Sequence, residues 1–136
     1  MLEMGVMNYP EESGSFPNMS GVTFSLNTEI PTAVKVDENG FFIDVDGEYR
    51  VCNVKVLDRN SGEYDDLDLD KKYILAGFEF HLLSSGDGLA MFEDAKIIDS
   101  EGTLDIELLE NYIADYLGGV IGEEYTKPKG RIAFIE

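Results

Sequence analysis

The sequence predicts an α+β fold in which mostly antiparallel strands accompany one long helix near the C-terminus. Short segments of alternating apolar and polar residues recur along the chain, with turn sequences between them. A later segment instead spaces its leucines and tyrosines as on one face of a helix. No repeat, low-complexity tract or linker interrupts the chain, so residues 1–136 are expected to form a single unit.

The first half of the chain predicts a short helix followed by paired strands. The helix ends at Pro10, because proline lacks a backbone N–H. A strand is expected at 22–26, where Val22, Phe24 and Leu26 alternate with Thr and Ser. The turn sequence DENG at 37–40 then predicts a hairpin between 34–36 and 41–43.

The next strand is expected at 51–57 and carries the only cysteine. Cys52, Val54 and Val56 alternate along it, so they are predicted to share one apolar face. Cys52 is therefore expected to be a buried, unreactive thiol. Apolar composition also predicts a buried strand at 73–78, a short strand at 91–98 and a final strand at 131–135.

The predicted long helix covers 104–117 and is expected to pack on the sheet. Thr103 or Asp105 is expected to cap its start, and Gly118 with Gly119 to end it. Its apolar stripe consists of Leu104, Leu108, Leu109, Tyr112, Ile113, Tyr116 and Leu117.

The charge of the chain excludes two classes of partner. It carries 28 Asp+Glu against 10 Lys+Arg, a formal net charge of −18. Nucleic acids and anionic membrane surfaces both require a basic footprint, so neither is an expected partner. No apolar run approaches the roughly 18 residues of a membrane-spanning helix, so membrane insertion is not expected either.

No catalytic or metal-ligating residue is predicted. His81 is the only histidine, which excludes any site that needs two. Asp66, Asp68 and Asp70 have the spacing of the first three ligands in a calcium loop. The loop template then requires glycine and later glutamate, but the chain has Lys71 and Gly77 there. We therefore interpret this acidic stretch as a solvated turn.

The loop at 84–88 is the one candidate binding site. It follows Phe78 and Phe80 and holds Asp87 between Gly86 and Gly88. Glycines allow a backbone to approach a ligand closely, an aromatic ring can stack on a base, and a carboxylate can accept hydrogen bonds from ribose hydroxyls. The alternative is a simple turn without a ligand.

Several segments together resemble one known family. They are PEESGSFPNMSG at 10–21, LDKKYILA at 69–76, SGDGLAMF at 85–92, NYI to LGGVIG within 111–122, and GRI at 130–132. They are similar to the C-terminal domain of bacterial 5′-nucleotidases and 2′,3′-cyclic-nucleotide 2′-phosphodiesterases. The resemblance extends over nearly the whole chain in one order, and it implies a 5′-nucleotidase C-terminal-domain-like fold.

The resemblance implies a role for the glycine loop in binding a nucleoside or nucleotide. Phe80 corresponds to a ring that stacks on the base, and Asp87 to the acid that contacts the ribose. Gly86 and Gly88 match loop glycines, whereas Ser85 replaces the first glycine of the family's Gly-Gly-Asp-Gly sequence. If the loop is counted one residue shorter, His81 takes the place of Phe80 as the stacking residue.

The resemblance also implies what lies outside these residues. The family's Asn-Gly-Gly-x-Arg and Pro-Phe segments are absent, so we expect the chain to be the back part of the domain. Hydrolysis and its divalent metals are expected in an N-terminal metallophosphatase domain, with no cofactor in this chain and no catalysis by the chain alone. The parent protein is expected to be extracellular, periplasmic or attached to the cell wall, although no signal peptide is visible.

One further expectation concerns association, and another concerns an alternative function. A domain lacking its first part leaves apolar surface and a strand edge uncovered, so a homodimer or larger assembly is expected. The alternative function is a non-enzymatic interaction module that keeps the family fold without binding nucleotides.

Overall fold

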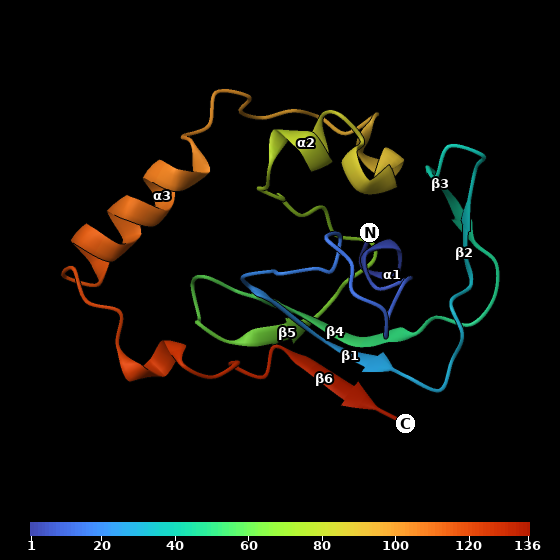
Figure 1. Ribbon diagram of the computed structural model, residues 1–136, viewed down its shortest axis with the longest axis horizontal. Helices are drawn as coiled ribbons and strands as arrows, with labels where there is room; N and C mark the ends of the chain where they lie inside the picture. Colours follow the sequence, from blue (N-terminus) through green and yellow to red (C-terminus); the bar gives the residue numbers. More distant parts are fainter. The chain divides into compact units, whose positions relative to one another are not determined.

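The computed structural model describes residues 1–136 and forms two compact units. The first contains Met1–Asp94 and Arg131–Glu136, and the second contains Ala95–Gly130. The expected α+β class is confirmed, with mostly antiparallel strands in two sheets (Figure 1). No helix combines the length and the apolar content needed to cross a bilayer.

A four-stranded sheet lies in the first unit. Its strands are β1 (Val22–Asn27), β4 (Val51–Leu57), β5 (Tyr64–Asp66) and β6 (Ile132–Ile135), in the order β5-β4-β1-β6. β1 is antiparallel to β4 and parallel to β6. The strands predicted at 22–26, 51–57 and 131–135 are thus confirmed, whereas β5 forms unpredicted within the acidic stretch.

The second sheet is the predicted hairpin of β2 (Val34–Val36) and β3 (Phe42–Val45). Asp37 closes its turn: Oδ1 accepts hydrogen bonds from the backbone N–H of Phe41 at 2.8 Å and of Asn39 at 2.9 Å. These bonds favour the charged carboxylate, and the Phe41 N–H does most to lower the pKa of Asp37.

The hydrophobic core lies between the sheet and the N-terminal segment. Val6, Phe24 and Leu26 are buried at its centre. Partly buried side chains surround them: Leu2, Tyr9, Phe16, Val22, Val51, Val54 and Ile132. The predicted N-terminal helix is confirmed as α1 (Leu2–Gly5), which is shorter than expected and contributes the buried Met4.

Two buried polar side chains attach the N-terminal segment to the sheet. Glu3 Oε1 accepts a hydrogen bond from the backbone N–H of Val51 at 2.6 Å. The Arg50 guanidinium donates to the carbonyl oxygens of Val6 and Tyr9, each at 3.2 Å. Because both side chains are almost inaccessible to solvent, these bonds replace part of the water that their polar groups have lost, whereas Glu3 Oε2 and Arg50 Nε are buried without a partner.

The segment at 10–21 packs back on α1. Ser13 Oγ lies 2.7 Å from Ser15 Oγ and also accepts from the Ser15 backbone N–H. A side chain at Gly5 would lie 3.1 Å from the Ser15 carbonyl oxygen, so glycine permits this close approach. In the structure, these serines stabilise a turn.

The prediction for Cys52 is wrong, because a β-bulge changes which residues share a face. Ser25 pairs with Cys52, but Thr23 pairs with Lys55, so β4 contains one extra residue. Asn53 takes up the extra length with a left-handed φ of 52°. Val51 and Val54 therefore both contact the core, and Cys52 is only half-buried.

The strands predicted at 73–78 and 91–98 do not form. The first segment is exposed and pairs with no strand, and Phe78 instead precedes α2 (Glu79–Leu82). The backbone N–H of Leu82 donates to the Phe78 carbonyl at 3.0 Å, so local helical bonds replace a sheet ladder. The second segment begins in a 3₁₀ turn, η2 (Ala90–Phe92).

In the second unit, helical structure covers most of the predicted 104–117. α3 (Asp105–Asn111) continues into a π-helical turn, η3 (Tyr112–Tyr116). The predicted stop is confirmed, since Gly118 and Gly119 adopt φ values of 65° and 82°. A 3₁₀ turn, η4 (Glu123–Tyr125), follows.

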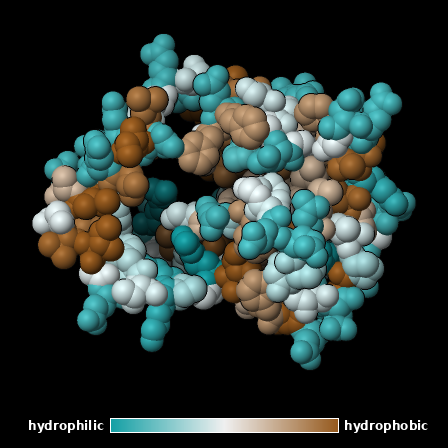
Figure 2. Space-filling model, in the orientation of Figure 1, coloured by the Kyte–Doolittle hydropathy of each residue, from teal (hydrophilic) through white to brown (hydrophobic).

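One detail of the helix prediction is wrong, and two others are not confirmed. Leu104 occupies the N-cap without a side-chain bond, so neither Thr103 nor Asp105 caps the helix. A long α-helix is not confirmed, because α3 ends at Asn111. Packing of this segment on the sheet is not confirmed either, since its apolar side chains are exposed within the second unit; Figure 2 shows them as hydrophobic surface. They include Leu104, Ile106, Leu108, Leu109, Tyr112 and Tyr116.

Candidate functional site

The candidate site is built on the turn between α2 and η1 (Gly86–Gly88). Ser85, Asp87 and Gly88 all have left-handed φ values, of 53°, 52° and 77°. This conformation is uncommon for residues with a side chain, although aspartate tolerates it better than most. These left-handed residues turn the chain sharply, and Asp87 is exposed on the loop.

Gly86 brings the loop into contact with Phe80. A Cβ atom at Gly86 would overlap the Phe80 ring and the Phe80 carbonyl oxygen. Only glycine permits this approach without a shift of the backbone. The Phe80 ring therefore lies against the loop, yet 57% of the residue remains accessible to solvent.

Gly88 attaches the other end of the loop to the rest of the first unit. A Cβ atom there would overlap the carbonyl oxygen of Gly40, in the turn between β2 and β3, and would lie 2.7 Å from Met4 Cε of α1. The hairpin turn and the N-terminal helix α1 therefore contact the loop at Gly88. Sequence reasoning missed both contacts, because nothing local links these residues to the loop.

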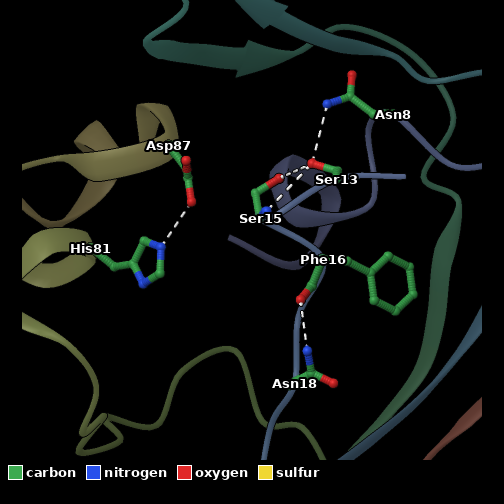
Figure 3. A network of polar contacts seen from close by, with 7 residues as sticks. All are labelled: Asn8, Ser13, Ser15, Phe16, Asn18, His81 and Asp87. Carbon is green, nitrogen blue, oxygen red and sulfur yellow. Dashed lines mark hydrogen bonds and ion pairs between the residues drawn. The ribbon is translucent and has the colours of Figure 1, made fainter. Parts of the chain in front are cut away.

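Asp87 forms a hydrogen bond with His81. His81 Nε2 lies 2.9 Å from Asp87 Oδ2, and the imidazole and the carboxylate point toward each other in Figure 3. A carboxylate can only accept, so the imidazole is the donor. Both side chains are about one third accessible, at 30% and 36%. The spacing of six residues across a glycine turn is the only sequence signal for this pair.

The two alternative stacking residues lie next to each other. The rings of Phe80 and His81 meet edge to face with centroids 5.2 Å apart, and the Phe78 ring lies 6.1 Å from that of His81. His81 is engaged by Asp87, whereas Phe80 has no polar group to satisfy and a largely open ring. This arrangement favours Phe80 as the residue available for stacking.

Ser85 stabilises the loop from its other side. Its Oγ donates a hydrogen bond to Glu93 Oε1 at 3.1 Å. Ser85 adopts the left-handed conformation that glycine takes more readily, so the hydroxyl bond offsets part of the conformational cost.

Phe80 and Asp87 thus flank His81 and provide an accessible aromatic ring and an accessible carboxylate. The first can stack on a planar base, and the second can accept hydrogen bonds from hydroxyl groups. No group of three or more His, Cys, Asp or Glu side chains is arranged to hold a metal ion. A hollow in the first unit lies elsewhere, between Val22, Phe24 and Ile132, and its volume of about 30 Å³ is far below that of a ligand pocket.

Comparison of the sequence with protein-family models and with curated proteins finds no match.

Proposed function

We propose that this chain is the substrate-binding portion of a 5′-nucleotidase-type hydrolase, and that its glycine loop holds the nucleoside part of a nucleotide. The observation that carries the proposal is the placement of Phe80 and Asp87. Asp87 lies on the loop 85–88 that resembles the family sequence, the Phe80 ring of α2 lies against that loop, and both side chains remain accessible to a ligand.

The chemistry of the two side chains fits a nucleoside. Stacking of a base on an aromatic side chain contributes about 1–3 kcal/mol. The Asp87 carboxylate accepts hydrogen bonds from ribose hydroxyls, which fixes the sugar beside the base. Association itself costs at least about 4 kcal/mol in lost translational and rotational freedom, so one ring and one carboxylate give weak binding.

The hydrolytic step belongs to another domain in this proposal. The family resemblance implies two divalent metals in an N-terminal metallophosphatase domain, and metals bound there would polarise the phosphate and activate water. This chain orients the nucleoside toward that domain. The parent protein is then an extracellular, periplasmic or cell-wall-associated enzyme that removes phosphate from nucleotides.

Exposed apolar surface supports the second candidate, a non-enzymatic interaction module. Leu104, Leu108 and Leu109 are each more than half accessible, and such surface is typical of a contact with another protein. In this alternative the loop is a structural turn and binds no nucleotide.

A binding assay separates these functions, and a phosphatase assay tests whether the chain is inactive alone. Equilibrium dialysis with adenosine is expected to show weak, millimolar binding that Phe80→Ala and Asp87→Ala abolish, whereas the interaction module shows none. Glu93→Gln, which leaves both proposed contact residues in place, is the matched control. A phosphatase assay on the same protein, with added divalent metals, is expected to show no turnover; metal-dependent turnover would overturn the proposal.

A further inference from the structure

The hydrogen bond between His81 and Asp87 occupies half of the carboxylate that the proposed function assigns to the ribose. Oδ2 accepts from His81 Nε2 at 2.9 Å, which leaves Oδ1 without a side-chain partner. A ribose offers two neighbouring hydroxyl groups, and a carboxylate can accept from both through its two oxygens. A ligand that uses both oxygens therefore meets the imidazole at Oδ2 and competes with it for that atom.

We propose that His81 is a specificity-determining residue that competes with the ribose hydroxyls for Asp87 rather than a stacking residue. The inference rests on the proposed function. With His81 in place, the free oxygen receives one hydroxyl, so the loop discriminates weakly between ribonucleosides and 2′-deoxyribonucleosides. When His81 is replaced by an apolar residue, both oxygens become available and a ribose is favoured.

The geometry separates this role from stacking. His81 meets the Phe80 ring edge to face and lies beside Phe78, so its ring orientation is set by two aromatic neighbours and one hydrogen bond. Its Nε2 is aimed at the carboxylate. Phe80, in contrast, keeps most of its surface open. Loss of the imidazole therefore frees a hydrogen-bond acceptor, whereas loss of Phe80 removes a stacking surface.

Protonation strengthens the competition. An imidazole gains its charge between pH 8 and pH 5, and the charged form pairs with a carboxylate more strongly than the neutral form. The other charged side chain on α2 is Glu79, and Glu93 accepts a hydrogen bond from Ser85 of the loop; both are acidic. Adenosine binding is therefore expected to weaken as the pH falls.

Another titratable group in the chain is the Met1 amine. Burial lowers its pKa from the ordinary value of 8.0. Every variant below keeps this amine, and His81 is the only histidine. A pH dependence that a His81 substitution removes therefore belongs to His81.

The experiment measures the dissociation constants of adenosine and 2′-deoxyadenosine by NMR titration at pH 5.5 and pH 8. For the unaltered chain we expect adenosine to bind about two- to fivefold more weakly at pH 5.5, the range expected for an exposed ion pair. His81→Gln keeps a donor near the Nε2 position and cannot gain charge, so its profile is expected to be flat. His81→Leu is expected to bind adenosine more tightly and to prefer it over 2′-deoxyadenosine.

The outcomes distinguish the inference from the proposed function. If adenosine binds and His81→Leu weakens it as Phe80→Leu does, His81 stacks on the base and the inference is wrong while the function stands. If the pH profile persists in His81→Gln, the inference is also wrong. If no variant binds either nucleoside, the proposed function fails and the inference falls with it. Circular dichroism confirms that each variant is folded.

Discussion

The backbone of Gly88 lies against the carbonyl oxygen of Gly40, so closely that a side chain at residue 88 would overlap it. This contact joins the candidate binding loop to the hairpin turn, although 48 residues separate the two glycines in the sequence. The loop therefore depends on the hairpin for its position. Four predictions about the fold follow from contacts of this kind, and a fifth concerns the ligand.

Gly88→Ala is expected to destabilise the first unit by about 2–4 kcal/mol. Part of the loss is the left-handed conformation at a φ of 77°, and the rest is overlap with backbone that cannot move aside. Chemical denaturation measures the difference. Gly14→Ala is the control, because a side chain there meets nothing within 4 Å; equal effects of the two substitutions would show that residue 88 is not closely packed.

Arg50→Met is expected to cost about 2–4 kcal/mol of folding free energy. The substitution keeps much of the side chain's length but leaves the carbonyl oxygens of Val6 and Tyr9 without their donor. Arg59→Met, at an exposed position, is expected to change stability by less than about 0.5 kcal/mol. A thermal melt in which both variants resemble the unaltered chain would contradict the anchoring role of Arg50.

Asp37 is expected to contribute stability at neutral pH that disappears in acid. Its pKa is lowered, chiefly by the Phe41 N–H, so the folded state favours the charged carboxylate. The contribution is present above the ordinary value of 3.8 and is lost as the pH falls through the lowered pKa. Urea midpoints of the unaltered chain and Asp37→Asn should differ at pH 7 and converge as the pH falls through the lowered pKa.

The control for this experiment is Glu38→Gln, which removes a neighbouring negative charge and leaves the turn hydrogen bonds intact. A gap between Asp37→Asn and the unaltered chain that persists unchanged at pH 2.5 would show that the hydrogen bonds to the carboxylate are not its source.

The exposed edge of β6 is expected to pair with a second copy of the chain. β6 ends the order β5-β4-β1-β6, and Phe134 on it is 54% accessible. Light scattering is expected to give twice the 15.1 kDa of one chain, more completely at high salt, which screens the repulsion between two chains of charge −18. Ala133→Lys places a charge on the edge and is expected to restore the monomer. A monomer at every concentration and salt would contradict this expectation.

The elements that the sequence predicts correctly are those whose signals are local. Examples are the alternation of Val22, Phe24 and Leu26, the turn at 37–40 and the glycines at 118–119. Each of these patterns predicts its element from neighbouring residues alone. Apolar composition alone misleads at 73–78, because a strand also needs a partner, and no periodicity supplies one.

Other features depend on contacts between distant residues and were not predictable from pattern. The burial of Cys52 depends on a bulge that only the pairing with β1 reveals. In the candidate site, the sequence indicates Phe80 and Asp87 by composition and resemblance. The hydrogen bond between His81 and Asp87 is visible only in the structure. The same holds for the contacts of Gly88 with Gly40 and Met4.

The most direct test of the account is an NMR titration of the isotope-labelled chain with adenosine up to millimolar concentration. The account predicts saturable shift changes in the loop 85–88 and in the rings of Phe80 and His81, which disappear in Phe80→Leu and in Asp87→Asn. Unchanged spectra at the highest concentration, or changes confined to residues outside this loop, would contradict nucleoside binding at the site.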